Sequence, residues 1–155
     1  ALRDYLNAQD DYIAVYANVE GGQASRNNAP SVVRSTIDTL AEQFRGVVGS
    51  YLPLQIRDEV RQVEPGSMLS TYLRRLAESL PKPIILVIDE IDALVGDSLV
   101  SVLRQIRSGY ADRPKAFPQS IILCSSVDIC DHRIFPALAG DRSVLNMLSC
   151  SIAID

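Results

Sequence analysis

The sequence predicts an open α/β fold in which helices cover a parallel sheet in three layers. Helix-like and strand-like segments alternate along the 155 residues, which is typical of this class. The strand-like runs over 12–19, 84–88 and 121–126 are mostly apolar on both faces, as expected for strands buried between helices. The chain contains no internal repeat, low-complexity tract or sign of a second domain. We therefore expect one domain over residues 1–155.

The first half of the chain begins with the end of a helix. Apolar residues at helical spacing support this helix up to about residue 9, and the strand over 12–19 follows. Gly21 and Gly22 end that strand. After a polar loop, Pro30 begins a helix with an apolar stripe made of Val33, Ile37, Leu40, Phe44 and Val47.

The middle of the chain contains a further helix and the clearest strand. The strand Ile84–Ile88 is entirely aliphatic and runs directly into Asp89 and Glu90. The helix before it begins at about Ser67, and Pro81 stops it. Its apolar stripe consists of Leu69, Leu73, Leu76 and Leu80.

The last part of the chain predicts one more helix and two strands. Asp97 is placed to cap the helix, and Pro114 marks the loop that follows it. The strand over 121–126 comes next. The tail from Val144 to Ile154 is apolar enough for a final strand, although Asn146 weakens the pattern. The helix carries an apolar stripe of Leu99, Leu103, Ile106 and Tyr110.

Composition argues against several classes of protein. The chain has 15 Lys and Arg against 19 Asp and Glu, a net charge of −4. This mild acidity removes the usual electrostatic basis for strong non-specific DNA binding, so a nucleic-acid partner is possible but unsupported. No uncharged apolar run reaches the roughly 18 residues that a membrane helix needs. The three cysteines are odd in number and lack CxxC spacing, which favours a reducing compartment, the cytoplasm.

The sharpest local feature is the acidic pair Asp89 and Glu90 at the end of a buried strand. Ligands of open parallel sheets bind beyond the carboxyl ends of the strands. Two adjacent carboxylates at that place suit magnesium–nucleotide chemistry, in which the first holds the Mg²⁺ shell and the second orients an attacking water. The alternative is that the pair merely solvates a strand end and caps the next loop.

The context of this pair resembles the AAA-like P-loop ATPases of the ASCE type, and more closely a group of bacterial ATP-binding proteins. In that family the run Ile84–Glu90 is the Walker B motif. The resemblance implies a P-loop NTPase fold, ATP and Mg²⁺ as ligands, Asp89 on the metal and Glu90 as the base. It rests on segments 82–97, 101–107, 116–120 and 131–134, and on Asn18, Val19, Glu20 and Gln23.

The chain departs from this family in its phosphate-binding part. A Walker A loop has the pattern G-x-x-x-x-G-K-[ST], because backbone N–H groups and the Lys contact the phosphates. The two lysines, Lys82 and Lys115, each follow a proline, and neither lies in a Gly-rich loop. Since residues 1–9 look like the end of the helix behind that loop, we expect the loop just upstream of Ala1. We expect a truncated core without the first central strand and the C-terminal lid.

Further site residues follow from the same resemblance. Ser125 or Ser126, at the end of the next strand, is placed to sense the γ-phosphate, although a hydroxyl there also serves simply to satisfy the strand end. Arg133 or Arg142 is placed to stabilise transferring phosphate charge, although such an Arg is more often a surface residue. Asp92 is expected to hold the loop after the strand.

Two functions remain open from the sequence. The first is the ATP-binding and ATP-hydrolysing core of an ATPase that switches or moves a protein partner and is inactive as this fragment. The second is a non-catalytic regulatory or interaction domain that keeps the α/β scaffold and the Asp89–Glu90 pair. The sequence does not reveal the partner, and an oligomer is compatible with both hypotheses.

Overall fold

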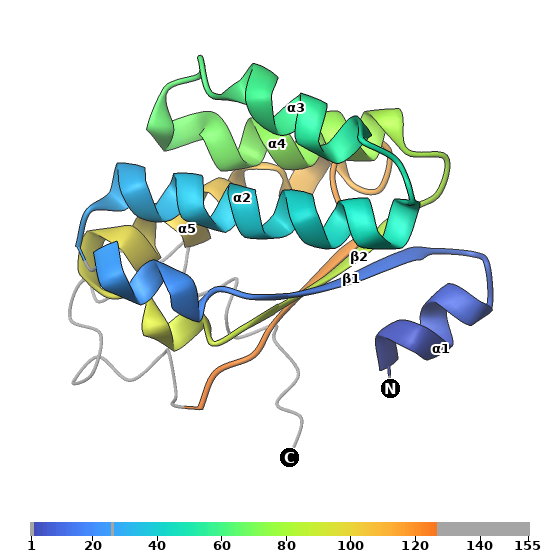
Figure 1. Ribbon diagram of the computed structural model, residues 1–155, viewed down its shortest axis with the longest axis horizontal. Helices are drawn as coiled ribbons and strands as arrows, with labels where there is room; N and C mark the ends of the chain where they lie inside the picture. The colour runs from blue at the N-terminus through green and yellow to red at the C-terminus, as the bar shows by residue number, and fades with distance from the viewer. Residues whose placement is uncertain (1, 26, 127–155) are drawn as a thin grey trace.

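The computed structural model of the chain describes residues 2–25 and 27–126 (Figure 1). These residues form a small parallel sheet with several helices, which confirms the α/β class. The strands are β1 (Ile13–Asn18), β2 (Ile84–Asp89) and β3 (Ser120–Leu123), in the spatial order β1-β2-β3. No helix in this part of the chain is long and apolar enough to cross a membrane.

The pairing of the strands brings their carboxyl ends to one edge of the sheet. β1 and β2 are in register from Ile13 opposite Ile84 to Asn18 opposite Asp89. β3 pairs with the other side of β2 and ends with Leu123 opposite Ile88. Because all three strands are parallel, the loops that follow them meet at this edge.

The crossover helices lie on one face of the sheet. α2 (Ala29–Val48), α3 (Leu52–Val60) and α4 (Pro65–Ser79) connect β1 to β2, and α5 (Gly96–Ser108) connects β2 to β3. Both connections step across the sheet in the same direction, so crossovers of one hand place their helices on the same side. Figure 1 shows α2 over the strands, with α3 and α4 beyond it.

The core lies between this helical layer and the sheet. The predicted stripes of α2 and α4 are buried there, because an amphipathic helix removes most apolar surface from water when its stripe faces the sheet. The residues at the centre of the core are Val33, Ile37, Leu40 and Phe44 of α2, Leu69, Tyr72, Leu73 and Leu76 of α4, and Leu86 and Ile88 of β2.

The opposite face of the sheet differs from the prediction. Burial alternates along β2, and the residues on its second face, Ile85, Val87 and Asp89, are only half-buried. On β1, Tyr16 is 38% exposed. Among residues 2–25 and 27–126 the crossover helices form one layer on one side, and burial of the strands on both faces is not seen there. The third layer and the P-loop NTPase type stay predictions.

α1 (Leu2–Ala8) lies beside the free edge of β1. The side-chain amide of Asn7 donates to the carbonyl of Ala14 and accepts from its N–H, both at 2.9 Å. These two bonds imitate a neighbouring strand and satisfy backbone groups that face away from β2. The helix predicted for the start of the chain is thus confirmed and helps to close the edge of the sheet.

Several element boundaries follow local contacts that the sequence does not reveal. α3 is not predicted, because its buried residues are few and packing against α2 and α4 stabilises it. Val95, and not Asp97, precedes α5 at the cap position. Tyr110 lies beyond α5 and is exposed. The final strand predicted over 144–154 lies outside the described residues.

Candidate functional site

The candidate site lies where the chain leaves the carboxyl ends of the strands. Backbone bonds continue the sheet for one step beyond the ladder: the N–H of Val19 donates to the carbonyl of Asp89 at 3.1 Å, and the N–H of Cys124 donates to the carbonyl of Ile88 at 2.8 Å. The N–H of Ile91 in turn donates to the carbonyl of Cys124 at 3.2 Å. These bonds hold the three strand ends rigidly side by side.

The loops that follow β1 and β2 pack closely on each other. The 3₁₀ turn η1 (Glu20–Ser25) contacts the turn η2 (Ile91–Ala93). A Cβ atom at Gly22 would lie 2.9 Å from Cδ2 of Leu94, so a larger residue at this position would push the loops apart. The acidic residues of both loops are therefore held within a small region.

Asp89 is oriented by two hydrogen bonds from different strands. Its Oδ1 accepts from the N–H of Glu90 at 2.9 Å, and its Oδ2 accepts from the hydroxyl of Tyr16 at 2.5 Å. The bond to the carboxylate raises the pKa of Tyr16 to about 12, because a phenol that donates to an anion loses its proton less readily. Each carboxylate oxygen keeps a further lone pair for a ligand.

Glu90 has an unusual backbone conformation and an unusual electrostatic environment. Its φ of 57° and ψ of 37° lie in the left-handed region, which non-glycine residues rarely adopt. Partial removal from water raises the pKa of its carboxyl group, and repulsion from Asp92, Asp89 and Glu20 raises it further. The sharp turn moves its side chain out of the strand pattern at the end of β2.

Ser126 connects the end of β3 to the turn after β2. Its hydroxyl donates to Oδ2 of Asp92 at 2.6 Å. Oδ1 of Asp92 is buried and has no hydrogen-bond partner among the described residues. The bond agrees with a structural role for Asp92 and with the structural alternative for Ser126, and the sensor role of Ser126 stays a prediction.

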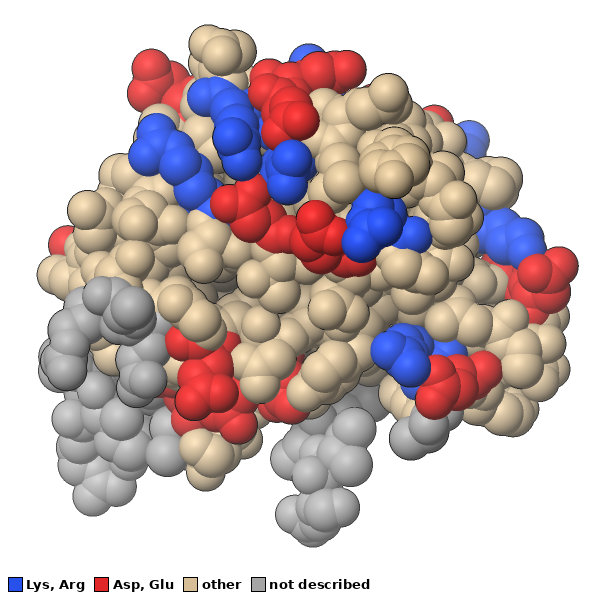
Figure 2. Space-filling model, viewed as in Figure 1, with Lys and Arg blue, Asp and Glu red and all other residues tan. Residues whose placement is uncertain are grey.

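The charged side chains described at this edge, Glu20, Asp89, Glu90 and Asp92, are all acidic. Glu20, Asp89, Glu90 and Asp92 make no ion pair with a Lys or Arg of residues 2–25 and 27–126. Figure 2 shows one group of acidic atoms at the lower left of the view with no blue atoms beside it, whereas basic and acidic atoms alternate over the upper helices. Negative charge that no described Lys or Arg pairs with favours a cationic ligand.

The donor set suits a hard cation such as Mg²⁺. Carboxylate oxygens are the ligands that Mg²⁺ prefers, and it is typically held by one or two carboxylates while phosphates and waters complete the octahedron. Asp89 offers such a carboxylate, and Glu90 is its neighbour. No group of three His, Cys, Asp or Glu within the described part of the chain is arranged to hold a metal ion by itself. Waters or the phosphates of a ligand would complete the coordination shell.

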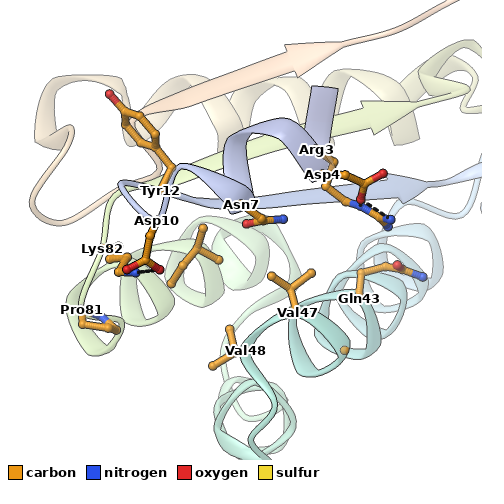
Figure 3. A pocket seen from close by; sticks show the side chains of 12 residues that line it. Arg3, Asp4, Asn7, Asp10, Tyr12, Gln43, Val47, Val48, Pro81 and Lys82 are labelled. Atoms are coloured by element: carbon orange, nitrogen blue, oxygen red, sulfur yellow. Dashed lines mark hydrogen bonds and ion pairs between the residues drawn. The ribbon is translucent and has the colours of Figure 1, made fainter. Parts of the chain in front are cut away.

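A groove of about 610 Å³ lies at the other end of the sheet (Figure 3). It runs between α1 and the last turns of α2, with Arg3 beside Asp4 at one end and Lys82 paired with Asp10 at the other. A second cavity of about 200 Å³ is lined by Lys82 and Lys115. Both lysines thus lie near the amino end of β2 and cannot serve a phosphate bound beside Asp89.

The structure brings together some of the predicted residues. Asp89, Glu90 and Ser126 lie at one edge of the sheet, as the alternation of strands predicts. Ser125 also follows β3. Arg133 and Arg142 lie outside the described residues, so their suggested role in stabilising phosphate charge stays a prediction.

Tyr16 is the residue of this region that sequence reasoning missed. Its place within an apolar strand suggested a core residue, and the pairing register alone places it on the same face as Asp89. The tyrosine hydroxyl was the available signal, because a buried Tyr needs a polar partner. Comparisons of the chain with models of known protein families, with curated proteins and with solved structures found no match.

Proposed function

We propose that the protein binds and hydrolyses ATP in a magnesium-dependent reaction, and that the carboxyl end of β2 is the Walker B part of its nucleotide site. The observation that carries this proposal is the position of Asp89 and Glu90. Asp89 is the last residue of the middle strand of a parallel sheet and Glu90 follows it, at the edge where ligands of such sheets bind.

The two carboxylates have different roles in this proposal. Asp89 is held in one orientation by Tyr16 and by the backbone, which suits a ligand of Mg²⁺ or of its water shell. Glu90 makes no hydrogen bond or ion pair through its carboxylate with the described residues, and its raised pKa makes it a better proton acceptor than an ordinary Glu. Glu90 therefore orients the attacking water and takes up its proton.

The test is steady-state ATP hydrolysis by the full-length protein with and without the change Glu90→Gln. We expect turnover to fall about 100-fold or more, because the water loses its base, while ATP binding is kept. Glu78→Gln, on the exposed side of α4, is the matched control and should hydrolyse ATP like the wild type. Unchanged turnover in the Glu90 variant would remove Glu90 from the mechanism.

The position of the lysines favours a second candidate, a non-catalytic domain that keeps the ATPase-like scaffold. Lys82 and Lys115 lie at the wrong end of β2 for phosphate binding. Since most phosphate-binding energy of this class comes from the loop and its Lys, we expect the 155-residue chain alone to show no micromolar binding of Mg-ATP by titration calorimetry. Micromolar binding would show that the nucleotide site has been misplaced.

A further inference from the structure

Tyr16 contacts the proposed metal ligand from a different strand. It lies on β1 two residues before Asn18, which is opposite Asp89, so the side chains of Tyr16 and Asp89 share one face of the sheet. The distance between the Tyr16 hydroxyl and Oδ2 of Asp89 is 2.5 Å. This bond joins the carboxylate to a residue 73 positions earlier in the chain.

The two hydrogen bonds to Asp89 restrict both of its carboxylate oxygens. Oδ1 is held by the N–H of Glu90, so without Tyr16 the second oxygen would be free to change its direction. Ligating carboxylates are commonly oriented by such outer hydrogen bonds, and loss of the outer partner typically weakens metal affinity by about 10- to 100-fold. The fold gains little from the hydroxyl itself, since the side chain is partly exposed.

We propose that Tyr16 is a positioning residue that orients the carboxylate of Asp89 for a divalent cation. The inference rests on the proposed function, because it takes Asp89 as the ligand of Mg²⁺. It adds to the 84–90 motif a group from β1, which the motif itself does not contain.

Cation affinity measured without nucleotide turnover tests this role. Mn²⁺ is the probe, and electron paramagnetic resonance of free Mn²⁺ gives its dissociation constant with the full-length protein. We expect Tyr16→Phe to raise this constant about tenfold. Asp89→Asn should raise it at least as much, and adding Tyr16→Phe to Asp89→Asn should change nothing further, because the carboxylate that Tyr16 orients is gone.

Tyr51→Phe is the matched control, because Tyr51 is 71% exposed and its hydroxyl makes no hydrogen bond with the described residues. It should bind Mn²⁺ like the wild type.

Tyrosine emission provides a second readout, since the chain has six Tyr and no Trp. Adding Mg²⁺ should change the emission of the wild type and of Tyr51→Phe, and should leave that of Tyr16→Phe unchanged. Thermal unfolding of each variant in the absence of metal verifies that the fold is kept.

The outcomes separate this inference from the proposed function. If Asp89→Asn weakens Mn²⁺ binding and Tyr16→Phe binds like the wild type, the positioning role is wrong and the magnesium site stands. An equal effect of Tyr16→Phe in the wild-type and Asp89→Asn backgrounds would also overturn it. If Asp89→Asn binds Mn²⁺ like the wild type, or the wild type binds none, the cation is not at Asp89 and both proposals fall.

Discussion

The two ends of the sheet use the same residue types in different ways. At the amino end, Asp10 has a left-handed φ of 63° and its carboxylate pairs with Lys82. At the carboxyl end, Glu90 has a left-handed φ of 57°, and Asp92, Asp89 and Glu20 repel its carboxylate. Both ends therefore contain backbone strain, but Asp10 has a cationic partner within the described chain, whereas at Glu90 like-charge repulsion adds to the strain.

This difference indicates where function lies. Exposed ion pairs contribute little to stability and are common on any surface. Strain and repulsion at one place lower stability, and proteins keep them where the surrounding structure and a ligand give them a use. The volume of the groove at the amino end is thus weaker evidence for a functional site than the electrostatics of the carboxyl end.

The largest expected difference between the two ends concerns magnesium. Asp89→Asn should raise the Mg²⁺ concentration needed for half-maximal ATP hydrolysis by about tenfold or more, because a direct or water-mediated ligand loses its charge. Asp10→Asn, the matched change at the amino end, should leave this concentration unchanged. The measurement is the rate of hydrolysis against Mg²⁺ at fixed ATP. Equal responses of both variants would remove the functional distinction between the ends.

Replacing Asp10 and Glu90 with glycine, each in a separate variant, should show how much the left-handed conformation costs at each end of the sheet. A side chain in this conformation costs about 1 kcal/mol, which glycine avoids. Glu90→Gly should therefore raise the melting temperature of the protein, since it also removes a like charge, while hydrolysis is lost. Asp10→Gly should change the melting temperature less, because the relief of strain is offset by loss of the Lys82 pair. A Glu90→Gly variant that melts below the wild type would show that the conformation is not strained.

The pH dependence of stability should show the repulsion at Glu90. Its pKa is raised above the ordinary value of 4.5, so the folded chain holds this proton more tightly than the unfolded chain does. Stability should therefore fall as pH rises from 4.5 through the raised pKa, and stay level above it. Urea unfolding at several pH values gives the free energy of unfolding of the wild type and of Glu90→Gln. The difference between these two free energies should widen over that range. A difference that narrows as pH rises would contradict the direction of the pKa shift.

The smallest effect is expected from the ion pair at the amino end. Lys82→Met should change the free energy of unfolding by about 0 to 1 kcal/mol, because the carboxylate of Asp10 is largely exposed and water screens the pair. Urea unfolding at low and high salt provides the measurement. A loss of several kcal/mol would mean that the amino end depends on its ion pairs, and that the contrast with the carboxyl end is weaker than the structure suggests.

The order of helices and strands was largely predictable. Ile84–Ile88 was recognisable because five consecutive aliphatic residues between a proline and two acids are typical of a strand. The apolar stripes of α2 and α4 were recognisable because their apolar residues recur every three to four positions, which is the period of a helix. α3 was missed, because a short helix with few apolar residues depends on the helices that it contacts.

The candidate site was predictable only in part. Asp89 and Glu90 are adjacent in the sequence, so their pattern was visible without a fold. Tyr16 is 73 residues away from Asp89, and its role depends on the pairing of two strands. The left-handed conformation of Glu90 was equally invisible, because no glycine marks the turn.

The sequence by itself determined which segments are buried and where a strand ends in two carboxylates, because hydrophobic period and local charge are properties of neighbouring residues. The tertiary structure decided which residues share that edge. The strand register brings the hydroxyl of Tyr16 to Asp89, and the end of β3 brings the hydroxyl of Ser126 to Asp92. Lys82 and Lys115 lie near the opposite end of the sheet. These contacts join residues far apart in the chain. They form, and can stabilise the fold, only once the strands have paired.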